Sequence, residues 1–204
     1  LMYDGQLRDF PTPEIDPYLV KRAHDTFHLT KLTAEDFKDG RPHAIIGLVP
    51  GEIISEDAGY IDHIDVEYDI LKVAVIERHK NTHHIGLGYI KGYGLKSGAV
   101  ATSISHDSHN IIVVGTNEEE MAAAANRIVE NHGGITVMEN GNVLGEVTLA
   151  IAGIMSDDPL VMVNSALESA KDEAFRLGVS RDIDPFMTLS FMALPVIPSL
   201  RLTT

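Results

Sequence analysis

The segment from Ser105 to Asn110 gathers more groups capable of chemistry than any other short stretch of the chain. It reads Ser-His-Asp-Ser-His-Asn, so two imidazoles, a carboxylate, two hydroxyls and an amide fall within six positions. A His-x-x-His spacing allows both imidazoles to bind one metal ion from a turn, and Asp107 can be a further ligand or orient an imidazole. The candidate pocket-lining residues are His106, Asp107, Ser108, His109 and Asn110.

Two other interpretations of this segment stay open. Asp and Asn side chains commonly fix turns through hydrogen bonds to the backbone, which would leave the imidazoles as packed polar groups. Asp107 with its Ser and His neighbours also has the residue types of a nucleophile triad, but adjacent residues on one turn rarely reach that geometry. The segment is therefore either a functional site, for a metal, a substrate edge or a domain contact, or a structural turn.

A second group of metal-competent side chains follows the apolar run that ends at Ile76. Glu77 and His79 come directly after it, with His83 and His84 close behind. If the strand predicted here neighbours the strand predicted over 99–105, these groups converge on the first segment. The sequence then predicts an auxiliary metal site whose candidate ligands are Glu77, His79, His106, Asp107 and His109.

Three further patterns have weaker claims to chemistry. The acidic stretch 62–69 has ligands for a divalent cation, but a solvated strand or loop is the favoured interpretation. His24 and His28 can share a helix face, yet they lie in a connector. The glycines between 86 and 98 resemble part of a dinucleotide-binding fingerprint, but the third comes one position late, so we expect turns and close backbone packing instead.

The elements that must position these groups follow from apolar patterning and turn residues. A helix begins at Thr116 or Asn117 and ends at Gly133, and a second begins around Ser156 and ends at Gly178. Short helical turns are expected over 18–25 and 33–37, and irregular or extended pieces over the tail 184–198. Strands are predicted over 43–49, 70–76, 99–105, 110–114, 135–139 and 143–149, with another starting within 52–54. We predict an α+β fold with a mixed or mainly antiparallel sheet and two main helices.

Composition excludes several classes of protein. The 204 residues carry 16 Lys and Arg against 30 Asp and Glu, a net charge of −14, which disfavours binding to nucleic acid. Cysteine is absent, which excludes disulfides, thiolate metal sites and cysteine nucleophiles. No apolar run is long enough to span a membrane, and the start of the chain is not a signal peptide. We expect a cytoplasmic protein, and we expect the chain to be a piece of a longer one.

At this point the order of motifs resembles the C-terminal region of bacterial and archaeal adenine deaminases, which are metal-dependent amidohydrolases. The resemblance runs from about residue 26 to the end and rests on several long motifs in the same order. These motifs are Val75–His79, Gly86–Gly98, Ala101–Gly115, the Gly133-Gly134 turn, Ile151–Ser156 and Leu194–Thr203.

The resemblance implies hydrolysis of adenine to hypoxanthine and ammonia. In such enzymes a binuclear centre of iron or manganese, held in a (β/α)₈ barrel, lowers the pKa of a bridging water. The present chain has no His-x-His and no eight-fold strand–helix alternation, so no barrel ligand carries over to it. We expect residues 1–30 to be a residual strand and connector from the preceding amidohydrolase domain, and residues 31–204 to be the C-terminal domain.

Three roles are expected for such a domain, and the fragment alone is expected to be inactive. The turn from His106 to Asn110 can help to close the adenine pocket, it can hold an auxiliary metal with Glu77 and His79, or the domain can assemble barrels into a homo-oligomer without chemistry of its own. Its expected partner is its own barrel domain, and it would meet adenine through the full enzyme. The alternative is a stand-alone α+β module that binds a small molecule or metal without catalysis.

Overall fold

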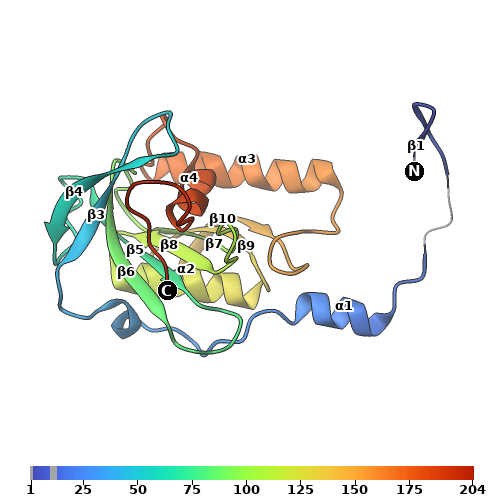
Figure 1. Ribbon diagram of the computed structural model, residues 1–204, viewed down its shortest axis with the longest axis horizontal. Helices are drawn as coiled ribbons and strands as arrows, with labels where there is room; N and C mark the ends of the chain where they lie inside the picture. The colour runs from blue at the N-terminus through green and yellow to red at the C-terminus, as the bar shows by residue number, and fades with distance from the viewer. Residues whose placement is uncertain (1, 10–12) are drawn as a thin grey trace.

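An eight-stranded open sheet forms the centre of the protein in the computed structural model, which describes residues 2–9 and 13–204 (Figure 1). The strand order is β10-β9-β7-β8-β5-β6-β3-β4, and every neighbouring pair is antiparallel except β3 with β6. The strands are β3 (His43–Leu48), β4 (Ser55–Ile61), β5 (Ile70–Ile76), β6 (Ile85–Lys91), β7 (Ala99–Thr102), β8 (Ile111–Gly115), β9 (Gly134–Glu139) and β10 (Asn142–Thr148). The predicted mixed, mainly antiparallel sheet is confirmed, and the described residues form no barrel.

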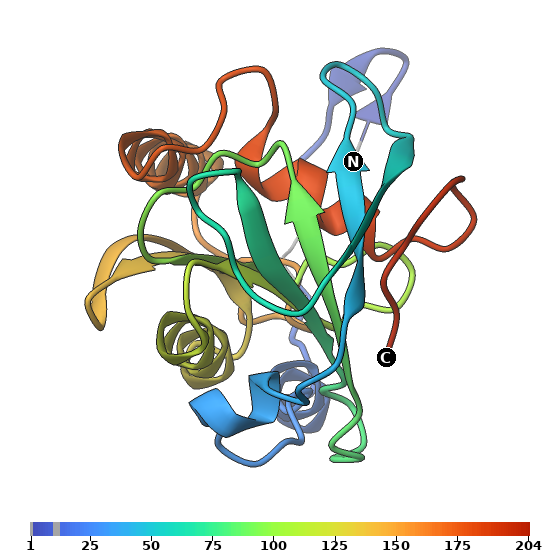
Figure 2. The same ribbon diagram turned by 90° about the vertical axis from the view of Figure 1, so that its left-hand side faces the viewer.

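Helices cover both faces of this sheet (Figure 2). The central strand β5 is buried on both sides, and its alternate residues enter two different cores: Val73 and Val75 face α3 (Leu160–Arg176) and α4 (Pro185–Met192), whereas Ala74 and Ile76 face α2 (Glu118–Glu130). This period of two explains why β5 is apolar at every position except Lys72. The two main helices that the sequence predicts are α2 and α3.

The helix α4 corrects the expectation of irregular or extended pieces over 184–198. Asp184 caps it by accepting hydrogen bonds from the backbone nitrogens of Phe186 (3.0 Å) and Met187 (2.9 Å), and Pro185 occupies the first turn, where its missing N–H costs nothing. Ser190 then ties the helix to the start of the 105–110 segment by donating to the carbonyl of Ile104. The tail after α4 is irregular, as expected.

The glycine segment 86–98 also differs in part from its prediction, because its first half is strand β6 rather than turns. Close backbone packing, the other part of that prediction, is confirmed. A side chain at Gly86 would lie 1.9 Å from the carbonyl oxygen of Thr203, and one at Gly94 would lie 2.7 Å from that of Gly178. The strand expected to begin within 52–54 begins at Ser55.

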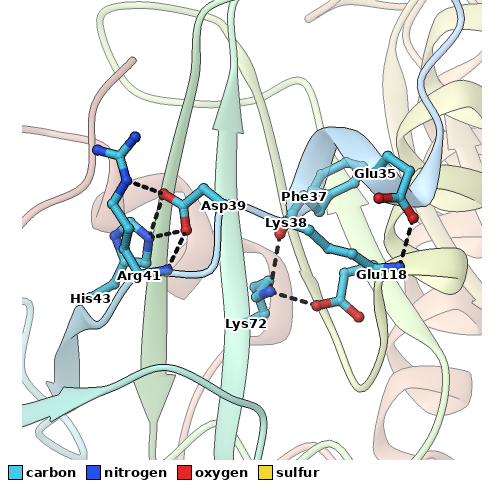
Figure 3. Close-up of polar contacts among 8 residues, drawn as sticks. All are labelled: Glu35, Phe37, Lys38, Asp39, Arg41, His43, Lys72 and Glu118. Atoms are coloured by element: carbon cyan, nitrogen blue, oxygen red, sulfur yellow. Dashed lines mark hydrogen bonds and ion pairs between the residues drawn. The ribbon is translucent and has the colours of Figure 1, made fainter.

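A buried lysine attaches the N-terminal part of the fold to the sheet (Figure 3). The one-turn helix η1 (Ala34–Phe37) inserts Phe37 into the α2 side of the core. Lys72 on β5 donates to the carbonyl oxygen of Phe37 at 3.0 Å and to Glu118 Oε1 at 2.5 Å. Because Glu118 begins α2, this lysine joins η1, β5 and α2 away from the 105–110 segment.

A two-stranded hairpin and a short helix precede η1. The strands β1 (Met2–Tyr3) and β2 (Gln6–Leu7) pair with each other only, and α1 (Pro17–His24) follows them. Residues 1 and 10–12, which include part of the expected connector, lie outside the described residues. Among the helices that are described, none combines the length and apolar character needed to cross a membrane.

Candidate functional site

The segment 105–110 forms a tight turn between β7 and β8. Asp107 and His109 have positive φ angles of 65° and 49°, and the His109 nitrogen donates to the Ser105 carbonyl at 2.7 Å. The hydroxyls of Ser105 and Ser108 lie 3.3 Å apart. Asp tolerates the left-handed backbone region better than most residues, so part of this motif serves the turn itself.

A cavity of about 310 Å³ opens beside this turn. Four of the five candidate residues line it, namely His106, Asp107, Ser108 and Asn110. The rest of the lining comes from β5 and from the chain after α4, and consists of Val75, Ala193, Pro195, Thr203 and Thr204. The sequence therefore predicted one wall of the cavity but missed the other, which the Leu194–Thr203 motif supplies.

Three buried polar atoms of the turn have no hydrogen-bond partner among the described residues. They are His106 Nε2, His109 Nδ1 and Asn110 Oδ1. Asn110 is only 6% exposed, and the His106 ring packs on Phe191 with centroids 4.5 Å apart. An unpaired buried polar group costs about 1–3 kcal/mol, and two of these three atoms belong to residues that line the cavity, His106 and Asn110.

Arg78 holds the turn in place through hydrogen bonds, a role that nothing in the sequence beyond the Val75–His79 motif indicated. Its side chain is 1% exposed and donates to the carbonyl oxygens of His109, Thr26 (2.8 Å) and Ala152 (2.9 Å). The guanidinium also lies over the ring of Phe27, 4.2 Å from its centroid. Burial lowers the pKa of Arg78 to about 10, although the charge of Glu77 opposes that shift. Arg78 remains a cation at neutral pH and joins three separate segments.

Glu77 and His79 lie close to the turn, but the strand pairing that brings them there differs from the predicted one. The strand β5 pairs with β8 and β6, not with the strand that precedes the turn. His79 Nε2 lies 2.8 Å from the carbonyl oxygen of Ser108. The carboxylate of Glu77 instead accepts from its own loop, from the backbone nitrogens of His79 (2.5 Å), Lys80 (2.9 Å) and Thr82 (3.1 Å) and from the Thr82 hydroxyl (2.8 Å).

The environment of Glu77 fits a structural anion better than a metal ligand. Burial raises the pKa of Glu77, but the hydrogen bonds from Thr82, His79 and Lys80 outweigh it and bring the pKa to about 2. Within residues 2–9 and 13–204, no group of three His, Asp or Glu side chains is arranged to hold a metal ion. In the part of the chain described, the five candidate ligands of the predicted auxiliary site are therefore not gathered into a group of three or more.

The His24–His28 pair and the acidic stretch 62–69, two of the weaker candidates, have different contacts in the structure. The helix α1 ends at His24, so His28 does not share its face, and His28 Nδ1 lies 3.9 Å from Asp25. In the acidic stretch, Asp69 accepts from the backbone nitrogens of Gly92 (3.0 Å) and Gly94 (2.7 Å), which fixes the turn after β6. Asp69 therefore serves the fold.

The sequence profile of the family described as "Adenine deaminase C-terminal domain" matches residues 52–204. The chain is 53% identical over 140 residues to an adenine deaminase of Bacillus subtilis strain 168, covering 69% of this chain and 24% of that protein. It is 44% identical over 185 residues to an adenine deaminase of Brucella anthropi (85% and 32%), and 44% identical over 190 residues to one of Bacillus velezensis (88% and 33%). The chain thus spans a quarter to a third of the length of these relatives.

Proposed function

Because this chain belongs to the family of adenine deaminase C-terminal domains, we propose that it is the part of an adenine deaminase that completes the adenine pocket with the turn 105–110. Hydrolysis of adenine to hypoxanthine and ammonia would then occur in the barrel-bearing remainder of the enzyme. We assign residues 1–30 to the strand and connector that lead from that remainder, and residues 31–204 to the domain itself.

The observation that carries the proposal is the set of unpartnered buried atoms at His106 Nε2, His109 Nδ1 and Asn110 Oδ1. An imidazole nitrogen and an amide oxygen are suited to the exocyclic amine and ring nitrogens of a purine, or to polar groups at the mouth of the barrel. The family's iron or manganese would supply the activated water when bound in the barrel. The role proposed for this chain is to orient the base and exclude water from it.

Kinetics with a matched measurement of assembly test this proposal. We would introduce His106→Ala and His109→Ala together into a full adenine deaminase that ends in this domain. The proposal predicts a fall of about 10² in kcat/KM for adenine with an unchanged sedimentation coefficient. Full turnover accompanied by dissociation would instead favour a domain that only assembles barrels into a homo-oligomer.

Metal analysis separates the remaining role, an auxiliary metal at Glu77, His79, His106, Asp107 and His109. The purified chain and its His106→Ala, His109→Ala variant would be compared by inductively coupled plasma mass spectrometry. We expect no stoichiometric metal in either protein, because the oxygens of Glu77 are already hydrogen-bonded within its own loop. One equivalent of metal that is lost in the variant would establish the auxiliary site and replace the pocket role.

A further inference from the structure

Among the described residues, none packs against the helix α1 in a way that buries its apolar side chains. None of its eight residues is fully buried, and Tyr18, Leu19 and Val20 are all exposed, Tyr18 by 63%. The helix is capped, since Asp16 accepts from the Tyr18 nitrogen at 2.8 Å. Helices shorter than about 12 residues are marginal in water and normally depend on packing of an apolar face. A helix this short with its apolar residues outward is therefore expected to pack against something beyond the residues described.

A second exposed apolar group begins α3. Leu160, Val161 and Met162 are consecutive and exposed, Leu160 by 84%. Figure 1 shows the start of α3 and the helix α1 at the same end of the molecule, with the chain 149–159 between them. That chain is joined to α1, because the Ala152 nitrogen donates to the Ala23 carbonyl at 2.6 Å.

We propose that α1 and the start of α3 form the surface that docks the barrel-bearing remainder of an adenine deaminase chain. The residues of this docking surface are Tyr18, Leu19, Val20, Leu160, Val161 and Met162. The inference rests on the proposed function, because it takes the occupant to be the two thirds or more of the relatives' length that this chain does not span. An apolar occupant of that size removes from water those of the six side chains that face it.

The docking surface is physically connected to the cavity. Arg78 binds the carbonyl of Thr26, just after α1, and the carbonyl of Ala152, before α3, while its third bond reaches the turn at His109. Through Arg78, the segments next to the docking surface are therefore linked by direct hydrogen bonds to the 105–110 turn.

Hydrogen–deuterium exchange tests the docking surface directly. Backbone exchange would be compared at equal temperature and pH in this chain alone and in a full adenine deaminase that ends in this domain. We expect the amides of α1 and of the first turn of α3 to exchange at least about tenfold more slowly in the full enzyme. Equal exchange at α1 in the two proteins overturns the proposal.

Variants give a second, independent measurement. Leu19→Ser with Val20→Ser should leave the thermal midpoint of the chain alone unchanged, because both side chains are exposed there, but should lower the midpoint of the full enzyme. Tyr60→Ser on the edge strand β4, which replaces a side chain that is exposed by 71% against 53% for Leu19 and 43% for Val20, is the control and should change neither. A full enzyme that tolerates the double variant as well as it tolerates the control contradicts the docking surface.

The outcomes distinguish this inference from the proposed function. Slow exchange at α1 with full activity of the histidine variant keeps the docking surface and removes the pocket role. Loss of activity in the histidine variant with fast exchange at α1 keeps the pocket role and removes the docking surface. Protection of α1 in the chain alone that rises with protein concentration, with a dimer in sedimentation, would assign the surface to a second copy and overturn the proposal.

Discussion

At the scale of single residues, Arg78 determines where the turn of the cavity sits. It is almost fully buried, and its three carbonyl partners belong to segments far apart in the sequence. A planar guanidinium can donate in three directions at once, whereas an ammonium on a flexible stem cannot match that fork. The turn, the connector and the 151–155 loop therefore share one positioning residue.

We expect Arg78→Lys to lower the free energy of unfolding by about 2–4 kcal/mol, because it keeps the charge but leaves buried carbonyls without donors. Urea unfolding of the chain measures this change. Arg176→Lys is the matched control, since Arg176 pairs with Glu173 on an exposed face of α3 and should change stability by less than about 0.5 kcal/mol. Equal stability losses in the two variants would contradict the role assigned to Arg78.

Glu77 predicts a pH dependence at the same scale. The pKa of Glu77 is about 2 in the folded chain against an ordinary value of 4.5, so the unfolded chain binds the proton first as pH falls. The stability contributed by Glu77 is fully present above pH 4.5 and is lost between pH 4.5 and 2. Glu77→Gln should be less stable than wild type at neutral pH, and its deficit should shrink across that window. A deficit that stays constant on acidification would argue against this carboxylate as the titrating group.

At the scale of elements, strand β6 and the chain end depend on each other. The space above Gly86 is occupied by the backbone of Thr203, whereas Gly88 faces the Leu202 side chain at an ordinary 3.5 Å. Gly86→Ala should displace residues 200–204, cost about 1–3 kcal/mol and open the cavity wall. Gly88→Ala should be neutral or stabilise by up to about 0.5 kcal/mol, because Ala is better than Gly inside a strand. Urea unfolding with limited proteolysis of the chain end compares the two, and identical behaviour would contradict the packing described.

The same elements show what could be predicted from the sequence and what could not. Helix α2 was predictable because Asn117 caps it and its apolar residues keep a helical period, and strands β9 and β10 were predictable from the two strand-like runs 135–139 and 143–149. Helix α4 was missed because it is apolar on nearly all sides, which removes the periodic signal, although Asp184-Pro185 was a valid start. Strand β6 was missed because its glycines, which make room for the chain end, resemble turn residues.

The candidate site was predictable only on one side for a similar reason. The polar turn is local in sequence, so its residue types could be recognised before the fold was known. The opposite wall at Pro195 and Thr203 and the support from Arg78 depend on contacts between distant segments. No local pattern encodes such contacts, and the neighbour relation assumed for β5 was wrong for the same reason.

At the scale of the whole molecule, the proposed function makes this a domain whose functional surface is completed by another part of the same enzyme. The unpartnered atoms of the turn and the exposed apolar residues of α1 and α3 are energetically unfavourable when the domain is on its own. Both unfavourable contributions disappear if the remainder of an adenine deaminase covers these groups. A polar group retained for function can be removed without loss of stability but with loss of activity, and this contrast separates a functional turn from a structural one.

The central claim is tested most directly by the kcat/KM for adenine of Asn110→Leu in a full adenine deaminase that ends in this domain. Leucine has a similar volume and lacks the unpartnered Oδ1, so the chain should be as stable as wild type or slightly more stable. If the turn completes the adenine pocket, we predict a fall of at least roughly tenfold in kcat/KM in a fully folded and assembled enzyme. An unchanged kcat/KM in that enzyme would contradict the claim that the turn completes the adenine pocket.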